Sequence, residues 1–227
     1  MKNELRFAFF DVDDTLIHIK SMFDFYHFWC YEVWHRPQLH DDFEAAFARM
    51  FSEGRTREEL NSAYYRYFTG VVPQLLDSAG SDWATDRLAR PEDLFVAPVV
   101  EELQRLQGEG VIPVFVSGSF NALLEPIART LEVPHILATN LEVGEDGLYT
   151  GNIMAPQTIG MGKALAVQGF LQHHVASPSR CYAFGDDLSD LPMLNVVGHP
   201  VAVGTGTILA ERAATANWPV IATSELS

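Results

Sequence analysis

The chain has 227 residues, of which 48% are hydrophobic, enough for a substantial core in one large domain or in a domain with a smaller companion. Thirty acidic against fifteen basic residues give a formal net charge of −15. This excess of acids argues against nucleic acid and anionic membranes as partners, because both bind through basic patches.

No apolar run approaches the roughly 20 residues that a membrane helix needs. The apolar stretch near the N-terminus is too short for a signal peptide and runs into acids, so we expect a cytoplasmic protein. Cys30 and Cys181 are the only cysteines. Two isolated thiols in a chain of this size predict neither a disulfide framework nor a zinc site.

The first predicted strand is the apolar run LRFAFF at residues 5–10, which ends at Asp11, Asp13 and Asp14. The carboxylates at positions i and i+2 project in the same direction if the extended conformation continues. Like charges so close together raise the pKa of one group or require a cation. We therefore expect a hard divalent ion with oxygen ligands, namely Mg²⁺, at this strand end.

Residues 18–94, called the helical insertion below, differ in texture from the rest of the chain. Their aromatic-rich segments repeat apolar positions at helical spacing and carry no convincing strand signal. We predict four or five helices here. A helical module placed directly after a strand of the site can fold over that site as a lid, or it can simply extend the core.

A second strand is predicted at residues 111–116, where VIPVFV runs into Ser117 and the sequence SGSFNALLEPIARTL. The glycine turn opens onto a helical pattern, and backbone N–H groups at a helix start can hold a phosphate. Taken alone, Ser-Gly-Ser before a helix is more often an ordinary N-cap.

A further strand is predicted at 135–139, and a hairpin at 141–153, where the sequence alternates around Asp146-Gly147. Lys163 follows two glycines at the start of another predicted helix, and alone it indicates only a solvated surface lysine. The remaining strands are predicted at 180–184, 199–204 and 218–223, and the first of these runs into Gly185 and then Asp186, Asp187 and Asp190.

Short apolar runs that alternate with helices predict an α/β fold with a doubly wound parallel sheet, buried on both faces. In such a sheet the ligand site lies outside the carboxyl ends of the strands. Asp11, Ser117 and Asp186 all stand at such ends, so we expect them to line one crevice. Carboxylates from two strand ends suit an octahedral Mg²⁺ that keeps some of its waters.

These residues carry a resemblance. DVDDT at 11–15 resembles the DxDxT signature of the haloacid dehalogenase superfamily, and Ser117, Lys163 and GDDLSD at 185–190 resemble its second, third and fourth motifs in the same order. The match spans residues 7 to about 204. The long helical insertion, VSGSF and the hairpin EDGLYTGNI are most similar to the phosphoserine-phosphatase-like branch. That resemblance implies a Rossmann-like catalytic core (1–17 and 95–227) and an all-helical cap domain (18–94).

The resemblance also implies Mg²⁺-dependent hydrolysis of a small phosphorylated metabolite, a phosphate monoester, through an aspartyl-phosphate. Asp11 would be the nucleophile, and Asp13 would protonate the leaving alcohol and then deprotonate the hydrolytic water. Thr15 would fix the geometry of the turn, and Asp14 would be a turn or cap residue.

The other motifs would bind the phosphoryl group and the metal ion. Lys163 would neutralise charge, while Ser117 and the amides of Gly118 and Ser119 would hold phosphate oxygens. The Mg²⁺ ligands would be Asp11, Asp186 and the backbone carbonyl of Asp13, with Asp190 in a supporting position and Asp187 as a weaker candidate near the metal or its waters.

One departure concerns the substrate. Phosphoserine phosphatases place a glutamate in the early cap to hold the substrate ammonium, and that position falls on or beside Lys20 here. Since a lysine repels an ammonium and attracts an anion, phosphoserine is disfavoured. Lys20 is the best single candidate for a contact to the leaving group, with an exposed lysine on a cap helix as the alternative. The arginine that holds the substrate carboxylate would fall near Tyr65 and Arg66.

Other functions stay open at this point. A dehalogenase or phosphonatase would not normally keep an acid at position 13. Phosphoryl transfer to an acceptor other than water would use the same residues. A non-catalytic binding protein would be expected to have lost Asp11, Asp13 or Lys163, and none is lost. The identity of the substrate and the oligomeric state are not readable from the sequence.

Overall fold

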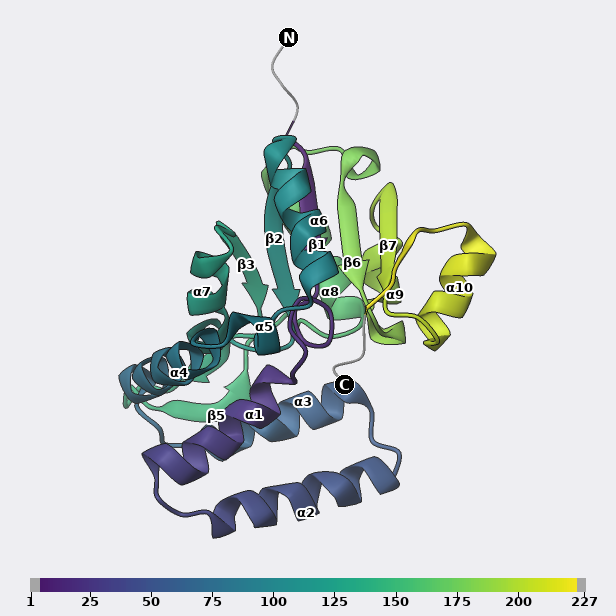
Figure 1. Cartoon of the computed structure of the whole chain (residues 1–227). Coiled ribbons are helices and arrows are strands. Elements are labelled where there is room, and N and C mark those ends of the chain that lie inside the picture. The colour runs from purple at the N-terminus through teal and green to yellow at the C-terminus, as the bar shows by residue number, and fades with distance from the viewer. Residues whose placement is uncertain (1–4, 224–227) are drawn as a thin grey trace.

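The computed structural model describes residues 5–223. Six parallel strands form the central sheet in the order β3-β2-β1-β6-β7-β8 (Figure 1). The strands are β1 (Phe7–Phe10), β2 (Ile112–Ser117), β3 (His135–Ala138), β6 (Tyr182–Gly185), β7 (His199–Val203) and β8 (Val220–Ile221). This doubly wound architecture confirms the predicted fold class, and every predicted sheet strand is present.

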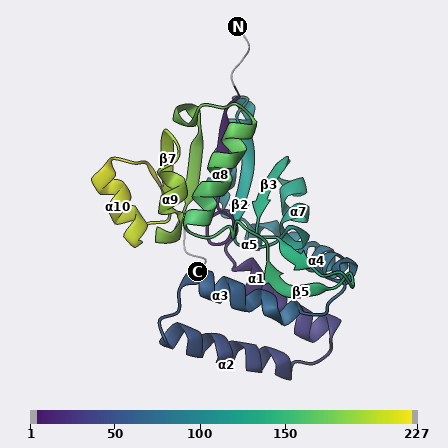
Figure 2. The same cartoon turned by 180° about the vertical axis from the view of Figure 1, so that it is seen from behind.

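The sheet is buried on both faces because its central strands β1 and β2 are apolar at every position except Ser117, the last residue of β2. Side chains alternate between faces, so Phe7 and Phe9 belong to one hydrophobic cluster and Ala8 and Phe10 to the other. Helix α6 (Ala97–Gly108) covers one face (Figure 1), and α8 (Met161–His173) and α9 (Leu191–Leu194) cover the opposite face (Figure 2). Helices α7 (Asn121–Thr130) and α10 (Ile208–Ala216) flank the two edges.

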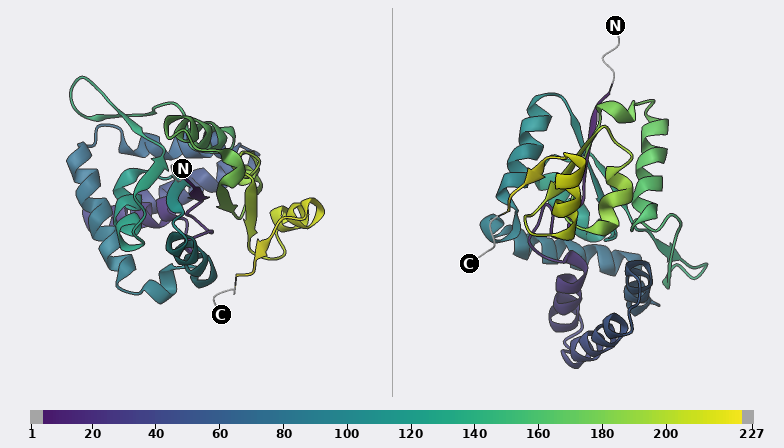
Figure 3. Two further views of the ribbon diagram at one scale, coloured as in Figure 1. Left: turned by 90° about the horizontal axis from the view of Figure 1, so that it is seen from above. Right: turned by 90° about the vertical axis from the view of Figure 1, so that its right-hand side faces the viewer.

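All regular elements of the helical insertion are helical, as predicted. They are α1 (Ser21–Phe28), a π-helical turn η1 (Trp29–Val33), α2 (Gln38–Ser52), α3 (Arg57–Tyr65), a 3₁₀ turn η2 (Arg66–Phe68), α4 (Pro73–Leu88) and α5 (Pro91–Leu94). Helix α3 begins with a capping box, in which Thr56 and Glu59 satisfy each other's backbone N–H groups. Helices α1 to α3 lie beyond the carboxyl ends of the strands (Figures 1 and 3).

An aromatic cluster joins the insertion to the core. Phe120, which precedes α7, has its ring centroid 5.7–6.4 Å from those of Phe25, Tyr64, Tyr65 and Phe68. One hydrophobic cluster contains buried residues from both parts of the chain. The insertion therefore covers the strand ends and also extends the core, while its division from the core as a separate domain stays a prediction.

The predicted hairpin is formed by β4 (Leu141–Val143) and β5 (Tyr149–Ile153). Gly147 in its turn has a φ of +80°, a conformation that glycine adopts without steric cost. The hairpin contacts the insertion, because the backbones of Tyr149 and Val71 are joined by a hydrogen bond of 3.0 Å.

Both cysteines are free and buried, as expected. None of the helices in residues 5–223 is long and apolar enough to cross a membrane.

The aromatic cluster gives a stability prediction. We expect Phe120→Ala to lower the free energy of unfolding by about 3–5 kcal/mol, the usual cost of truncating a buried phenylalanine. Phe120 is buried, whereas Leu165 on α8 is 56% exposed, so the control Leu165→Ala should change the same quantity by less than about 0.5 kcal/mol. Urea denaturation measures both. Equal effects of the two substitutions would show that Phe120 does not anchor the insertion.

Candidate active site

The register of the sheet brings the predicted site residues together. Phe10 is paired with Phe115 on one side and with Phe184 on the other, so the strand ends that follow them are level. A cavity of about 300 Å³ opens there. Nine of the predicted site residues line it: Asp11, Asp13, Lys20, Ser117, Gly118, Ser119, Lys163, Asp186 and Asp187. The other two, Thr15 and Asp190, are fully buried behind these residues.

Lys163 lies at the centre of the charges. It is 3% exposed at the start of α8, so it is not a surface lysine. Its Nζ is 2.6 Å from Asp11 Oδ1 and 2.6 Å from Asp190 Oδ1. Burial lowers the pKa of Lys163, but the charges of Asp11 and Asp190 have the larger, opposite effect. Together they hold this pKa well above its ordinary value. The ammonium is therefore charged and holds the two carboxylates in place.

Three carboxylates crowd around this one ammonium. Oxygens of Asp11, Asp186 and Asp190 lie within 4.8 Å of one another. Burial and the charge of Asp190 raise the pKa of Asp11 well above its ordinary range and raise that of Asp186 to about 6. One ammonium cannot balance two buried carboxylates and the half-buried one of Asp186, and oxygen donors are the ligands that hard divalent cations prefer. The donor set therefore fits Mg²⁺.

Asp13 differs from its neighbours. Burial raises the pKa of its carboxyl to about 6, although hydrogen bonds from Ser21 lower it. Its Oδ1 is buried without a hydrogen-bond partner among the described residues. An unpaired buried carboxylate oxygen is costly unless it is protonated or meets a ligand. Asp13 therefore suits proton transfer to a group that enters the cavity.

Two buried side chains, those of Thr15 and Asp190, hold Asp186 and Lys163 in position. Thr15 donates its hydroxyl to Asp186 Oδ1 at 2.8 Å, so it orients this aspartate as well as lying in the turn. Asp190 accepts from Lys163 through Oδ1 and from the backbone N–H of Asp187, at 3.2 Å, through Oδ2. With both oxygens engaged, Asp190 fits the supporting position better than a metal-ligand position. A Cβ on Gly185 would lie 2.6 Å from that of Asp190, so only glycine permits this approach.

Asp187 interacts with a different set of residues. It caps the 3₁₀ turn η4 (Leu188–Asp190) by accepting from the Ser189 N–H at 2.8 Å, and it pairs with Arg57 at 2.8 Å. Burial raises its pKa, but the Ser189 hydrogen bonds and the charge of Arg57 lower it below the ordinary value. Asp187 does not belong to the group of three carboxylates. This geometry favours a structural role over contact with a metal.

Residues 117–119, called the 117–119 loop below, run from the last residue of β2 toward the start of α7. Ser117 Oγ accepts a hydrogen bond from the Ser119 N–H at 3.0 Å. The N-cap of α7 is Phe120 and receives no side-chain hydrogen bond, so the interpretation of these serines as an ordinary N-cap is wrong. A Cβ on Gly118 would lie 2.2 Å from Ile159 Cδ1, so a larger residue at this position would require the Ile159 side chain to move.

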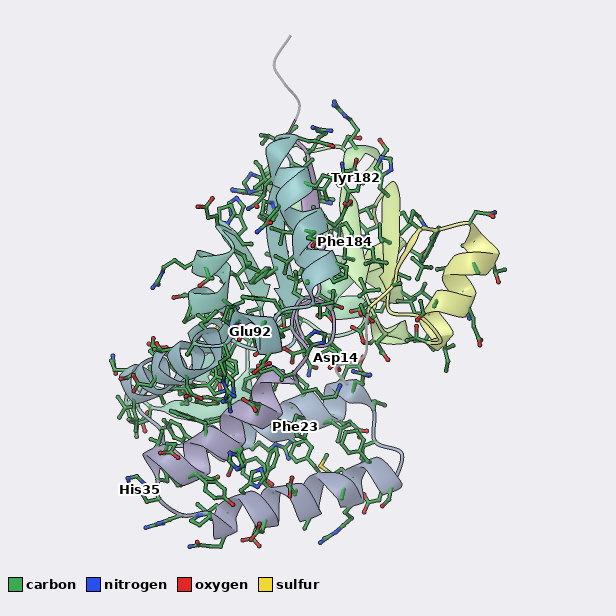
Figure 4. All side chains as sticks on the ribbon, viewed as in Figure 1. Asp14, Phe23, His35, Glu92, Tyr182 and Phe184 are labelled. Atoms are coloured by element: carbon green, nitrogen blue, oxygen red, sulfur yellow. The ribbon has the colours of Figure 1, made fainter. Side chains whose placement is uncertain are left out.

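Two ion pairs join the insertion to the core at the rim of the cavity. Lys20 precedes α1 and pairs with Asp14 at 2.5 Å, while Arg57 at the start of α3 pairs with Asp187. Asp14 has a φ of +60°, as suits the predicted turn residue. Figure 4 shows Asp14 and Phe23 between the sheet and α2. Lys20 lies at the cavity as expected, half exposed, but it already has an anionic partner.

Sequence reasoning missed Arg57, Asn61 and Tyr65, all on α3. Arg57 and Asn61 line the cavity, and Tyr65 and Asn61 both donate hydrogen bonds to the carbonyl of Gly118. No sequence signal marks such contacts, because the acceptor is a backbone group that every residue carries. The resemblance to phosphoserine phosphatases predicts a substrate-binding arginine near Tyr65 and Arg66, whereas the arginine that lines the cavity is Arg57.

Comparisons with known proteins agree with this geometry. The family model of haloacid dehalogenase-like hydrolases matches residues 8–195. A probable phosphatase of Mycobacterium tuberculosis is 31% identical over 225 residues, which cover 96% of this chain and 75% of that protein. A histidinol-phosphatase of Neisseria meningitidis is 28% identical over 135 residues, which cover 56% of this chain and 61% of that protein.

Solved structures share the fold. A protein of unknown function from Bordetella pertussis Tohama I superposes with a TM-score of 0.83 at 24% identity, covering 96% of this chain and 99% of that one. A substrate-bound phosphoserine phosphatase superposes with a TM-score of 0.67 at 15% identity, covering 97% and 94%. The chain therefore belongs to the haloacid dehalogenase-like hydrolase family, as its four motifs predict, and it is an enzyme of the phosphatase type.

Proposed function

We propose that this enzyme is a Mg²⁺-dependent phosphatase that hydrolyses a small-molecule phosphate monoester through an aspartyl-phosphate intermediate. The observation that carries the proposal is the buried Lys163 ammonium, 2.6 Å from the carboxylate of Asp11, in a cavity that the 117–119 loop also lines. A nucleophile beside a fixed cation suits attack on an anionic phosphoryl group. We also propose a cytoplasmic location, as expected from the sequence.

The first half-reaction would form a bond between Asp11 and phosphorus and break the bond from phosphorus to the leaving oxygen. Asp13 would give its proton to that oxygen, and a pKa of about 6 leaves part of the population protonated near neutral pH. In the second half-reaction Asp13 would take a proton from a water that attacks the phosphorus. The bond to Asp11 would then break, releasing phosphate and the free carboxylate.

The surrounding groups would orient the phosphoryl group and balance its charge. Lys163 would stay protonated and contact both Asp11 and a phosphoryl oxygen, while the Ser117 hydroxyl and the Gly118 N–H would bind the other oxygens, since the Ser119 N–H is already donated to Ser117 Oγ. Asp11, Asp186 and the backbone carbonyl of Asp13 would hold Mg²⁺, which when bound supplies positive charge next to the phosphoryl oxygens. Asp190 and Thr15 would keep Lys163 and Asp186 in position.

The leaving group would be selected by the helical insertion. The part of the cavity wall that the insertion supplies includes Phe23, Phe51, Leu60 and the cations Lys20 and Arg57. The core motifs are all assigned to the phosphoryl group and the metal. Relatives named histidinol-phosphatase and phosphoserine phosphatase differ in the leaving group that their names imply, so family membership leaves this choice open. Transfer to an acceptor other than water has no specific support among the described residues.

The nucleophile can be tested directly. We expect Asp11→Asn to lower kcat by at least about 10³-fold, because it removes the group that forms the covalent intermediate. Beryllofluoride should bind the wild type as an acyl-phosphate mimic and should not bind the variant. Hydrolysis of p-nitrophenyl phosphate and fluoride-dependent thermal shifts measure the two effects. Turnover by Asp11→Asn near the wild-type rate would assign the nucleophile to another residue.

The metal assignment predicts both loss of activity and a stability effect. Chelation should abolish turnover, and Mg²⁺ should restore it. At a concentration of about 100 times its Kd, Mg²⁺ should raise Tm by about 5–10 °C, since binding to the folded state alone contributes about 2.7 kcal/mol. Asp186→Asn should remove this shift, whereas Asp187→Asn should keep most of it. Full activity in excess EDTA would contradict the proposal.

Selection by the insertion is tested at Lys20. We expect Lys20→Glu to raise KM for the natural substrate about tenfold, the order of effect of a lost charged contact, while KM for p-nitrophenyl phosphate stays near the wild-type value. A panel of phosphorylated metabolites identifies the substrate for this comparison. Equal losses on both esters would assign Lys20 to the common phosphoryl chemistry, and no change on either would make it a surface residue.

A further inference from the structure

The carbonyl oxygen of Gly118, in the middle of the 117–119 loop, accepts two hydrogen bonds from the helical insertion. Tyr65 donates its hydroxyl at 2.7 Å, and Asn61 donates its side-chain amide at 2.9 Å. Tyr65 is fully buried and Asn61 is 7% exposed. Both donors come from α3, so an element outside the core determines where this carbonyl points.

A third segment fixes the orientation of Asn61. Gln157, in the connection between β5 and α8, donates to Asn61 Oδ1 at 2.8 Å and to the backbone carbonyl of Glu58 at 2.9 Å. Because Oδ1 is the acceptor in the first bond, the amide nitrogen of Asn61 is directed to Gly118. The arrangement is therefore a connected network and not a single contact.

The direction of the Gly118 carbonyl also determines where the Ser119 N–H points, because both belong to the peptide group that joins Gly118 and Ser119. In a trans peptide the C=O and the following N–H point in opposite directions. The Gly118 carbonyl faces α3, and the Ser119 N–H is donated to Ser117 Oγ at 3.0 Å. Ser117 Oγ therefore acts as the acceptor in this bond. The proton of the Ser117 hydroxyl is then available for donation to a group in the cavity, which Ser117 lines.

Glycine would not hold this orientation by itself, because its backbone has more accessible conformations than that of any other residue. We infer that Tyr65 and Asn61 are positioning residues for phosphoryl binding: by holding the Gly118 carbonyl they orient the peptide plane that aims the Ser117 hydroxyl. This inference rests on the proposed assignment of the 117–119 loop to the phosphoryl group. The insertion would thus act on the phosphoryl site as well as on the leaving group.

The chain offers a matched control one residue away. Tyr64 is fully buried like Tyr65, and its hydroxyl also donates to a backbone carbonyl at 2.7 Å. The acceptor is Met22 in α1, so the bond stays within the insertion. Tyr65→Phe and Tyr64→Phe therefore remove the same chemical group and a hydrogen bond of the same length to a backbone carbonyl, and only the bond of Tyr65 reaches the 117–119 loop. The Tyr65 hydroxyl also contacts the side chains of Thr139 and Asn61.

The experiment compares these two variants with the wild type, each saturated with Mg²⁺. We expect Tyr65→Phe to raise the Kd of inorganic phosphate, measured by calorimetry, about 5- to 10-fold, the range for one lost hydrogen bond between neutral groups. It should lower kcat/KM by one common factor for p-nitrophenyl phosphate and for an alkyl phosphate, because the affected contact is to the phosphoryl group. Both substitutions should lower Tm by similar amounts, because each removes one buried hydrogen bond. Tyr64→Phe, however, should leave the Kd of phosphate within about twofold of the wild-type value.

Asn61→Leu provides the second arm, and the Tyr65→Phe/Asn61→Leu double variant should weaken phosphate further than either single change. Equal phosphate affinities of Tyr65→Phe and Tyr64→Phe would overturn the inference, as would losses that depend on the leaving group. The titration needs no turnover. Suppose that Tyr65→Phe raises the Kd of phosphate but the wild type hydrolyses no phosphate ester. That result would support the inference and contradict the proposed function. Hydrolysis with unchanged phosphate affinity would contradict the inference alone.

Discussion

The ion pairs of Lys163 with Asp11 and Asp190 are the interaction on which the site depends. A lysine that is 3% exposed is stable as an ammonium only because two carboxylates lie 2.6 Å away, and those carboxylates are stable in a buried position only because of the lysine. Asp186 adds a third negative charge that this pairing does not balance. The site therefore carries an excess of negative charge, which the Mg²⁺ of the proposed mechanism would balance.

The surrounding backbone has to bring these charges within contact distance. The parallel register places the ends of β1 and β6 side by side, and the Asp11 N–H donates to the Phe184 carbonyl at 3.0 Å, so the first motif is fixed directly to the strand of the fourth. Gly185 lets Asp190 approach where any side chain would collide. The stacked rings of Phe10 and Phe184, 4.3 Å apart and fully buried, lie just before the aspartates in the sequence.

The strands and the motif residues were predictable, because apolar runs that stop at acids or glycines are local signals and the sheet register converts strand ends into neighbours. The roles of single residues within a motif were less so. Asp187 resembles a metal-site acid in the sequence, but the capping of η4 and Arg57 engage it instead. Tyr65 and Asn61 were unpredictable, since they recognise a backbone carbonyl and their approach depends on how α3 packs against the core. The helical nature of the insertion was visible in its periodicity, but its contacts with the core were not.

The position of the insertion in the chain explains why it affects the site so closely. It begins only a few residues after Asp13. Ser21 at the start of α1 donates its hydroxyl to that of Ser119 at 3.0 Å, and its backbone N–H donates to Asp13. The 117–119 loop is followed directly by Phe120, whose ring packs among aromatic residues of the insertion. Polar contacts at the loop and apolar contacts just beyond it thus come from the same helices. A displacement of α1 or α3 would break both sets together, so the packing of the insertion and the geometry of the 117–119 loop form one cooperative unit.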